Sequence, residues 1–313
     1  MSKIAPVVLF VYARLDHLQQ TIEALQKNYL AKETKLIIYS DNAVKESHEA
    51  DVLAVRNYLK TISGFESVEI SEAKQNKGLA KSIIEGVTEQ VNKYDRIIVM
   101  EDDLVSSPYM LNFMNEALDF YQNEDRVMQI SAYSYPSSKF IPETYFMSLA
   151  SSWGWATWKR AWNHLSLDTD AHIENIRKRN LENRFNIEGG MSFFCHLTMN
   201  QEGSLNTWAV KWYASVFLRN GLVLYPKTSL IRNIGHDGSG MNCTEIEDFK
   251  EQKLASKVRV KKMPLKENER ARAGVSKFMK QSMHFIPTPL QRIKNKVRDK
   301  IKYELSKLRA KKS

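Results

Sequence analysis

Short β-branched runs alternate with amphipathic helical patterns through the first 130 residues, and this alternation constrains the fold more than any other feature. After the first run, Leu18, Ile22 and Leu25 recur at spacings of three and four, which places them on one helix face. Strands that alternate with helices form βαβ units, with parallel strands and helices covering the sheet. The expected strands are residues 7–11, 35–40, 68–71 and 96–100, and the expected helices are residues 16–28, 46–61 and 78–91.

The expected fold class is therefore α/β, with a mostly parallel, doubly wound sheet of the nucleotide-binding type. Ligands of such sheets bind outside the carboxyl ends of the strands. Here polar residues follow every strand, but no glycine-rich phosphate loop of the dinucleotide or P-loop type does. A bound phosphate would need another group to neutralise it. The polar residues at these ends are Arg14, then Asp41, then Lys77, and finally the triplet Glu101, Asp102 and Asp103.

The acidic triplet directly follows the apolar residues 97–100. Consecutive carboxylates at a buried strand end repel one another and lose solvation, so their charges need a partner. Mn²⁺ or Mg²⁺, held by one or two carboxylates and by substrate phosphates, would provide that partner. The alternative is a helix N-terminus, whose dipole favours acidic side chains. The position after the fourth strand of an α/β sheet favours the cation.

The second half is expected to be helical and rich in tryptophan, with four of the six tryptophans between residues 153 and 162. Aromatic rings stack on sugars, but they are also good core residues. Trp158 and Trp162 have helical spacing and are expected to pack. Trp153 and Trp155 flank Gly154 in an expected loop, so they are the better candidates for contact with a ligand.

A glycine-rich loop at residues 235–240 carries His236 and Asp237. Of the seven histidines, only His236 lies in a glycine-rich segment. Such a loop closes readily over a ligand, and histidine binds metals and phosphates. A solvent-exposed loop histidine is the alternative.

The net charge of +10 combines two unlike parts. Residues 1–252 carry 26 Lys and Arg against 32 Asp and Glu, whereas residues 253–313 carry 20 against 4. After Thr288 and Pro289, apolar residues from Leu290 to Leu308 recur at spacings of three and four among basic ones. This pattern is typical of a basic amphipathic helix lying on an anionic membrane surface. A packed or oligomerising helix is the alternative, and the acidic body argues against nucleic acid.

Two cysteines are too few for a disulfide framework, and no stretch has the length of a signal peptide or a membrane span. The expected location is cytoplasmic, peripheral at the inner face of the plasma membrane.

In their order along the chain, these motifs resemble GT-A-fold glycosyltransferases, especially the N-acetylglucosaminyltransferase I group and bacterial surface-polysaccharide glycosyltransferases. The resemblance covers roughly residues 4–243, and the acidic triplet is its most specific element. The shared motifs are Pro6-Val7-Val8 through Arg14, Ser40-Asp41, Glu101-Asp102-Asp103-Leu104 with Pro108, Ser131-Ala132, and Gly154-Trp155 leading to Trp158.

The resemblance implies a metal-dependent enzyme that moves a sugar from a nucleotide-diphosphate donor, expected to be a UDP-sugar, to a glycan or lipid-linked glycan, with inversion. It implies that Arg14 lies near the diphosphate and Asp41 near the uracil or ribose, with Lys77 in the same donor-binding set. For Arg14, a surface salt bridge is equally compatible with the sequence. Asp103 would ligate the metal, Glu101 and Asp102 would touch the nucleotide, and His236 would complete the metal or diphosphate site.

The resembled family has its catalytic carboxylate just before the tryptophan that is Trp208 here. This chain has Asn206 and Thr207 there, and neither is a general base at neutral pH. Glu202 and Asp237 are the remaining nearby carboxylates, and the sequence does not choose between them. A catalytically impaired carbohydrate- or membrane-binding protein is therefore one alternative.

A sugar-nucleotide nucleotidyltransferase is the other alternative, although residues 10–16 lack the glycine-rich loop of that class. The expected organisation is a catalytic domain of residues 1–250 and a basic membrane-associating tail of residues 251–313. Residues 1–130 would bind the nucleotide sugar, and residues 131–250 the acceptor.

Overall fold

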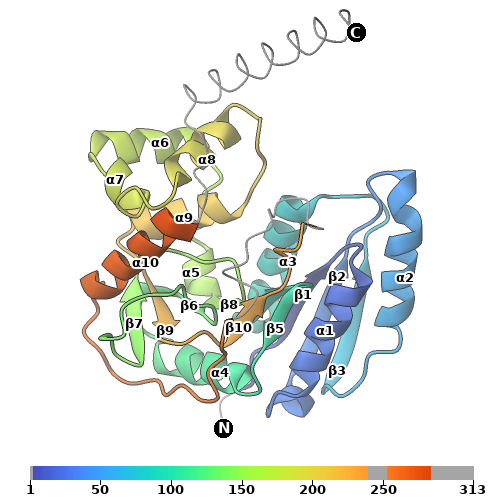
Figure 1. Ribbon diagram of the computed structural model, residues 1–313. Coiled ribbons are helices and arrows are strands. Elements are labelled where there is room, and N and C mark those ends of the chain that lie inside the picture. Colours follow the sequence, from blue (N-terminus) through green and yellow to red (C-terminus); the bar gives the residue numbers. More distant parts are fainter. Residues whose placement is uncertain (1–2, 239–251, 283–313) are drawn as a thin grey trace, which may run out of the picture.

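The computed structural model describes residues 3–238 and 252–282 and is built around an eight-stranded sheet (Figure 1). The strands of this sheet are β1 (Val7–Val11), β2 (Lys35–Ser40), β3 (Ser67–Glu72), β4 (Arg96–Glu101), β6 (Val127–Ser131), β7 (Thr144–Met147), β8 (Trp155–Trp158) and β9 (Leu222–Pro226). Their order is β3-β2-β1-β4-β8-β6-β9-β7. Only β8 and β7 run against the other strands. The expected α/β fold with a mostly parallel sheet is confirmed.

Helices cover both faces of this sheet. Trp155 and Trp158 lie three positions apart on β8, so their side chains point to opposite faces. The Trp158 Nε1 atom donates to the carbonyl of Leu118 in α4, 3.2 Å away, whereas Trp155 packs on tryptophans of α5 and α9. The helices are α1 (Leu15–Gln26), α2 (Glu49–Leu59), α3 (Leu79–Tyr94), α4 (Met110–Phe120), α5 (Lys159–Trp162), α6 (Thr169–Lys178), α7 (Glu182–Phe185), α8 (Phe193–Gln201), α9 (Ala209–Leu218) and α10 (Glu269–Ser282), with short 3₁₀ turns η1 (Ala31–Glu33) and η2 (Glu46–His48).

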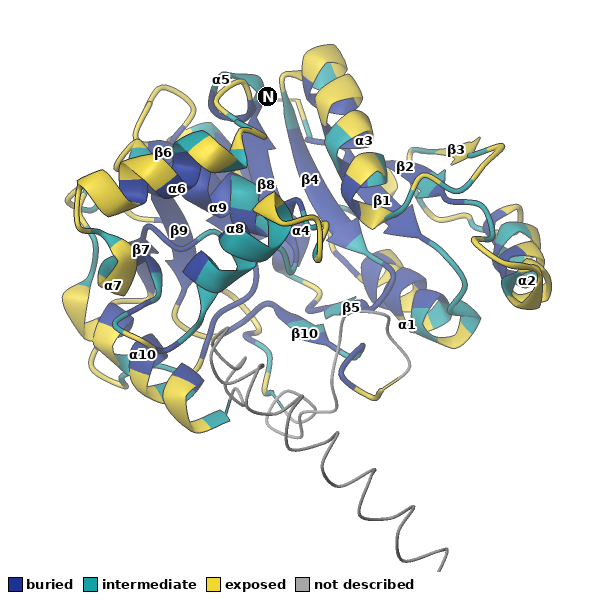
Figure 2. Cartoon of the chain, turned by 90° about the horizontal axis from the view of Figure 1, so that it is seen from above, coloured by how far each residue is buried: buried dark blue, intermediate teal, exposed yellow. Residues whose placement is uncertain are grey.

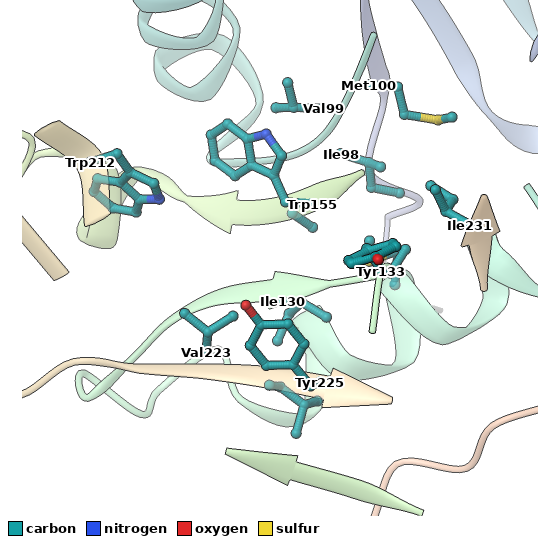
Figure 3. Packing of buried hydrophobic residues seen from close by; sticks show 14 of the residues in the cluster. Ile98, Val99, Met100, Ile130, Tyr133, Trp155, Trp212, Val223, Tyr225 and Ile231 are labelled. Atoms are coloured by element: carbon teal, nitrogen blue, oxygen red, sulfur yellow. The ribbon is translucent and has the colours of Figure 1, made fainter. Parts of the chain in front are cut away.

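The two expected halves of the body share this one sheet, because β8 from the second half lies between β4 and β6. Figure 2 shows the central strands mostly buried while the flanking helices expose one side. The core between the sheet and its helices is rich in aromatic residues (Figure 3). A buried polar pair orders it, since Trp212 Nε1 donates to Gln129 Oε1 at 2.6 Å.

A second, two-stranded sheet was not expected from the sequence. It pairs β5 (Leu104–Ser106) antiparallel with β10 (Ile231–Asn233). Because β5 begins directly after the acidic triplet, this pairing brings a distant part of the chain to the end of β4.

Residues 252–282 pack against the body, beyond the expected boundary at residue 250. Val258, Val260 and Val275 are buried in the core, and the Asn268 backbone N–H donates to the Phe146 carbonyl at 2.8 Å. The expected amphipathic helix of residues 287–313 lies outside the described residues. Among the residues described, no helix has the length and apolar character needed to cross a membrane.

Candidate functional site

The site forms where β1 and β4 end, because these two strands are neighbours and run parallel. Arg14 follows β1, and Asp102 and Asp103 follow β4. The Arg14 Nη2 atom donates to Asp102 Oδ1 at 2.5 Å and to Asp103 Oδ2 at 2.7 Å. Both aspartates are buried, with exposed fractions of 5% and 7%. The structure thus brings together three of the residues that the sequence singled out.

Negative charge is in excess at this site. Burial, reinforced by Asp103 and then Asp102, raises the pKa of Glu101 to about 8. Burial also raises the pKa of Asp102 and outweighs the attraction of Arg14. For Arg14, burial alone would lower the pKa, but the two aspartates outweigh it and raise the pKa above the ordinary value. One guanidinium is therefore not enough to balance the three carboxylates.

Two residues that the sequence did not single out hold the acidic turn in place. The Thr21 hydroxyl donates to the Asp102 carbonyl at 2.8 Å and accepts from the Leu104 N–H at 3.1 Å. The Tyr12 N–H donates to Asp102 Oδ2 at 3.3 Å. Thr21 was detectable in principle, since it is a hydroxyl on the apolar face of α1, beside Ile22.

The loop after β10 lies directly on the acidic turn. The Ile234 N–H donates to the Asp103 carbonyl at 2.9 Å. A Cβ atom added to Gly235 would lie 2.1 Å from Asp103 Oδ2 and 3.0 Å from Arg14 Nη1. Only a glycine allows the backbone to approach the two charged groups this closely.

The next residues of this loop connect it to other candidates. His236 is 6% exposed, and its ring lies edge-on to Trp153 with centroids 5.1 Å apart. Asp237 Oδ2 lies 3.0 Å from Nε2 of His17, which belongs to α1. His236 and Asp237 therefore directly follow the part of the loop that lies on Asp103, and Trp153 contacts this loop through His236.

Asp41 has a structural task at the neighbouring strand ends. Its carboxylate accepts hydrogen bonds from the backbone N–H groups of Asn42, Lys77 and Gly78 at 2.8, 2.9 and 2.8 Å. The Asn76 side chain donates to it at 3.2 Å. These four bonds occupy the acceptor capacity of a carboxylate, so Asp41 orders the loops after β2 and β3 and has no free position for a nucleotide. The Lys77 ammonium pairs with Glu85 Oε2 at 2.7 Å on the protein surface.

Three other predicted site residues are placed elsewhere. Trp155 is completely buried in β8 and stacks on Trp208 with centroids 5.3 Å apart, so its predicted contact with the donor is corrected to a core role. The sequence did not indicate this role, because the neighbouring Gly154 favoured a loop where the structure has the start of β8. Glu202 and Asn206 are exposed and lie in the segment after α8.

The carboxylates fit a hard divalent cation only if a substrate contributes ligands. Within residues 3–238 and 252–282, no group of three or more His, Cys, Asp or Glu side chains has the arrangement of a metal site. Mg²⁺ and Mn²⁺ need oxygen ligands, and Mg²⁺ commonly takes one or two carboxylates and completes its shell with substrate phosphates and water. Asp103 and Asp102 supply such carboxylates, and His236 lies on the adjoining loop.

No protein-family model and no curated protein matches the sequence. The solved structures that are similar in part include the following two. The mannosyltransferase PcManGT from Pyrobaculum calidifontis, in complex with GDP-Man and Mn²⁺, has a TM-score of 0.39 and 8% identity over 68% of each chain. A UDP-glucose pyrophosphorylase complexed with UDP-glucose has a TM-score of 0.36 and 11% identity over 71% of this chain and 90% of its own. We therefore base the function on the residues of this chain.

Proposed function

We propose that the protein is a divalent-cation-dependent glycosyltransferase that moves a sugar from a UDP-sugar, or a related nucleotide-diphosphate donor, to a glycan or lipid-linked glycan of surface polysaccharide synthesis. The observation that carries this proposal is the buried ion-paired cluster of Arg14, Asp102 and Asp103 at two neighbouring strand ends. It combines carboxylates for a cation with a guanidinium for a diphosphate. Both are needed when the leaving group is an anionic nucleotide.

Asp103 would be the direct ligand of the cation, and Asp102 and Glu101 would lie toward the nucleotide. A cation held there would offset the negative charge that grows on the leaving diphosphate. The Arg14 Nη1 atom is buried and makes no hydrogen bond among the described residues. A buried donor without an acceptor is costly, so this nitrogen is suited to bind a phosphate oxygen.

His236 and Trp153 would form the wall of the site next to the cation. Their edge-to-face contact packs the residue that follows Gly235, whose backbone lies close to Asp103. Asp237 is the favoured general base, because its loop lies on the cluster through the hydrogen bond from the Ile234 N–H to the Asp103 carbonyl. Inversion of the anomeric centre would follow from a single direct displacement.

The nucleotidyltransferase alternative is disfavoured by the connection between β1 and α1. It consists of residues 12–14 and contains no glycine, so it is too short to wrap a triphosphate. A carbohydrate-binding protein without activity would keep the donor site but lack turnover. Consumption of a nucleoside triphosphate with release of pyrophosphate would identify the protein as a nucleotidyltransferase.

The test is titration of UDP with and without Mn²⁺ into the wild-type protein, Asp103→Asn and Asp51→Asn. Asp51 is an exposed residue of α2, so its variant is the same chemical change away from the cluster. We expect Mn²⁺-dependent UDP binding in the wild type and in Asp51→Asn, and its loss in Asp103→Asn. Equal Mn²⁺-dependent affinity in all three proteins would contradict the proposed site.

Turnover is tested by UDP release from UDP-sugars in the presence of glycan acceptors. If Asp237 is the base, Asp237→Asn should lower the rate by about 10²- to 10⁴-fold, the usual contribution of a general base, while Glu202→Gln should not. If instead the protein is impaired at Asn206, Asn206→Asp should raise the rate by a similar factor. A wild-type protein that binds UDP but never releases it from any donor would favour the binding-protein alternative.

The acceptor and the location are proposed from the sequence of residues 287–313, whose basic amphipathic pattern fits the inner face of the plasma membrane. A lipid-linked acceptor would be reached from that surface.

A further inference from the structure

A basic segment of residues 253–262, here called the basic strap, is fixed to the side of the body. It contains no acidic residue. Val258 and Val260 are buried with exposed fractions of 2% and 8%, while the residues between and beside them are exposed. This alternation holds the strap by its valines and turns its charged side chains to the solvent. The exposed basic residues are Lys253, Lys257, Arg259, Lys261 and Lys262.

The strap follows α4 from one end to the other. The Lys257 ammonium lies 5.4 Å from the ring centre of Tyr109, the residue before α4. The Lys261 carbonyl accepts a hydrogen bond from the hydroxyl of Tyr121, the residue after α4, at 3.0 Å. Between them the Val260 N–H donates to Glu116 Oε1 at 3.3 Å. In Figure 1 this part of the chain is the orange trace that passes α4.

Exposed aromatic side chains mark both ends of this surface. Tyr29 is 69% exposed and contacts Tyr109 edge-on, with centroids 6.4 Å apart. Phe120 is 46% exposed and contacts Tyr121, with centroids 4.8 Å apart. The surface thus presents a row of basic side chains between two aromatic rings.

We propose that the basic strap, with Tyr29 and Phe120, is a contact surface for anionic membrane lipids. Two carboxylates lie beside the strap, since Glu116 and Glu143 accept backbone N–H groups from it, but its five basic side chains outnumber them. Amphipathic aromatic side chains such as Tyr are favoured at the boundary between headgroups and acyl chains. Basic side chains near the surface add attraction to anionic headgroups.

This contact goes beyond the proposed activity and involves residues other than 287–313. Its place on the folded body gives it a distinct consequence. A tail alone would tether the body in any orientation, whereas a strap along α4 fixes which side of the body faces the lipid.

The experiment is co-sedimentation of the full chain with phosphatidylcholine vesicles, with and without phosphatidylglycerol. The strap variant combines Lys257→Gln, Arg259→Gln and Lys261→Gln. The matched control combines Lys60→Gln, Lys81→Gln and Lys178→Gln, which remove the same charge from exposed positions directly after α2 and within α3 and α6. Each near-surface basic residue contributes about 1 kcal/mol, and 1.4 kcal/mol is tenfold, so the strap variant should bind anionic vesicles roughly 10²-fold more weakly. The control should bind nearly as the wild type does.

A second variant, Tyr29→Ser with Phe120→Ser, keeps the charge and should also weaken binding to anionic vesicles. Equal losses in the strap variant and in its control would overturn the proposal, since net charge would then explain binding. Tighter binding of the wild type to polyuridylate than to anionic vesicles would overturn it in favour of nucleic acid. UDP affinity should be the same in every one of these variants as in the wild type. The UDP titration therefore tests the proposed donor site separately from the vesicle sedimentation, which tests the strap.

Discussion

Gly235→Ala is the most direct test of whether the loop after β10 is part of the functional site. The added Cβ would lie 2.1 Å from Asp103 Oδ2, whereas an ordinary contact needs 3.4 Å or more. The loop or the carboxylate must therefore move by about 1.3 Å. Asp103 is restrained by its ion pair with Arg14, and the loop is restrained by the hydrogen bond from Ile234 N–H to the Asp103 carbonyl. Neither partner moves without loss of a contact.

Insertion of a methyl group into such a contact costs about 1 to 3 kcal/mol of folding free energy. Because the loop end is exposed at Asp237 and Gly238, we expect the lower part of that range. The effect on function should be larger, since a displacement of about 1 Å in a positioned site can cost roughly 10²-fold in rate. Gly235→Ala should thus lose Mn²⁺-dependent UDP affinity and turnover while remaining folded.

The assay combines thermal unfolding with titration of UDP in Mn²⁺. Gly238→Ala is the matched control, because Gly238 lies in the same loop and a Cβ there would have no described atom within 4 Å. Gly238 has a φ of 86°, so its variant tests backbone strain without the collision at Asp103. If Gly235→Ala bound UDP as the wild type does, or if both variants lost affinity equally, the loop would not act through contact with Asp103.

Three further predictions concern stability. Arg14→Gln should lower the free energy of unfolding by about 3 kcal/mol, because it leaves buried carboxylates unpaired, and Mn²⁺ should raise its melting temperature more than that of the wild type. An equal rise in melting temperature with Mn²⁺ in both proteins would contradict a site at which Arg14 and the cation neutralise the same carboxylates. Gly154→Ala should lower the free energy of unfolding by about 2 to 4 kcal/mol, because Gly154 has a φ of 63° and its added Cβ would lie 2.1 Å from Ile231 Cδ1. Adding Ile231→Val should recover only the part of this loss that comes from the collision, and not the part that comes from the backbone conformation. Burial lowers the pKa of His172 below 6.5, so the unfolded chain binds the proton more readily and stability is lost as pH falls below about 6.5. Urea unfolding at pH 7.5 and 5.5 should show a smaller acid loss for His172→Gln than for the wild type.

The first four strands and the meeting of Arg14 with the acidic turn could be predicted from the sequence. Their signals are local, because periodicity assigns each element and the parallel rule brings the strand ends together. The approach of Gly235 to Asp103 could not be predicted in this way. It depends on pairing between β5 and β10, two three-residue strands about 125 positions apart, for which local periodicity contains no signal.

A count of charges alone does not reveal how the basic strap packs. Counting Lys and Arg placed residues 253–282 in a tail. The alternation of Lys257, Val258, Arg259, Val260 and Lys261 has a period of two, which is typical of a half-buried extended segment. The two valines determine how this segment packs, because their side chains are buried in the core while the charged side chains beside them stay in water. For Asp41 no sequence signal existed, since three of its four hydrogen-bond donors come from a loop about 35 residues later.

The charges at the site also determine the order in which ligands are able to bind. Glu101, Asp102 and Asp103 outnumber Arg14, and burial, reinforced by the charges of Asp103 and Asp102, raises the pKa of Glu101. An anionic diphosphate would meet this surplus at close range, where two like unit charges 4 Å apart repel by about 4 kcal/mol at an effective dielectric constant of 20. Arg14 cannot relieve the repulsion alone, because its Nη2 atom is already committed to both aspartates. A divalent cation on Asp103 would offset the surplus negative charge and allow the unbonded Arg14 Nη1 atom to bind the diphosphate. Donor binding should therefore require the cation beforehand or together with the donor, and UDP affinity in a chelating buffer should fall by at least the roughly 10²-fold expected for loss of two favourable charge contacts.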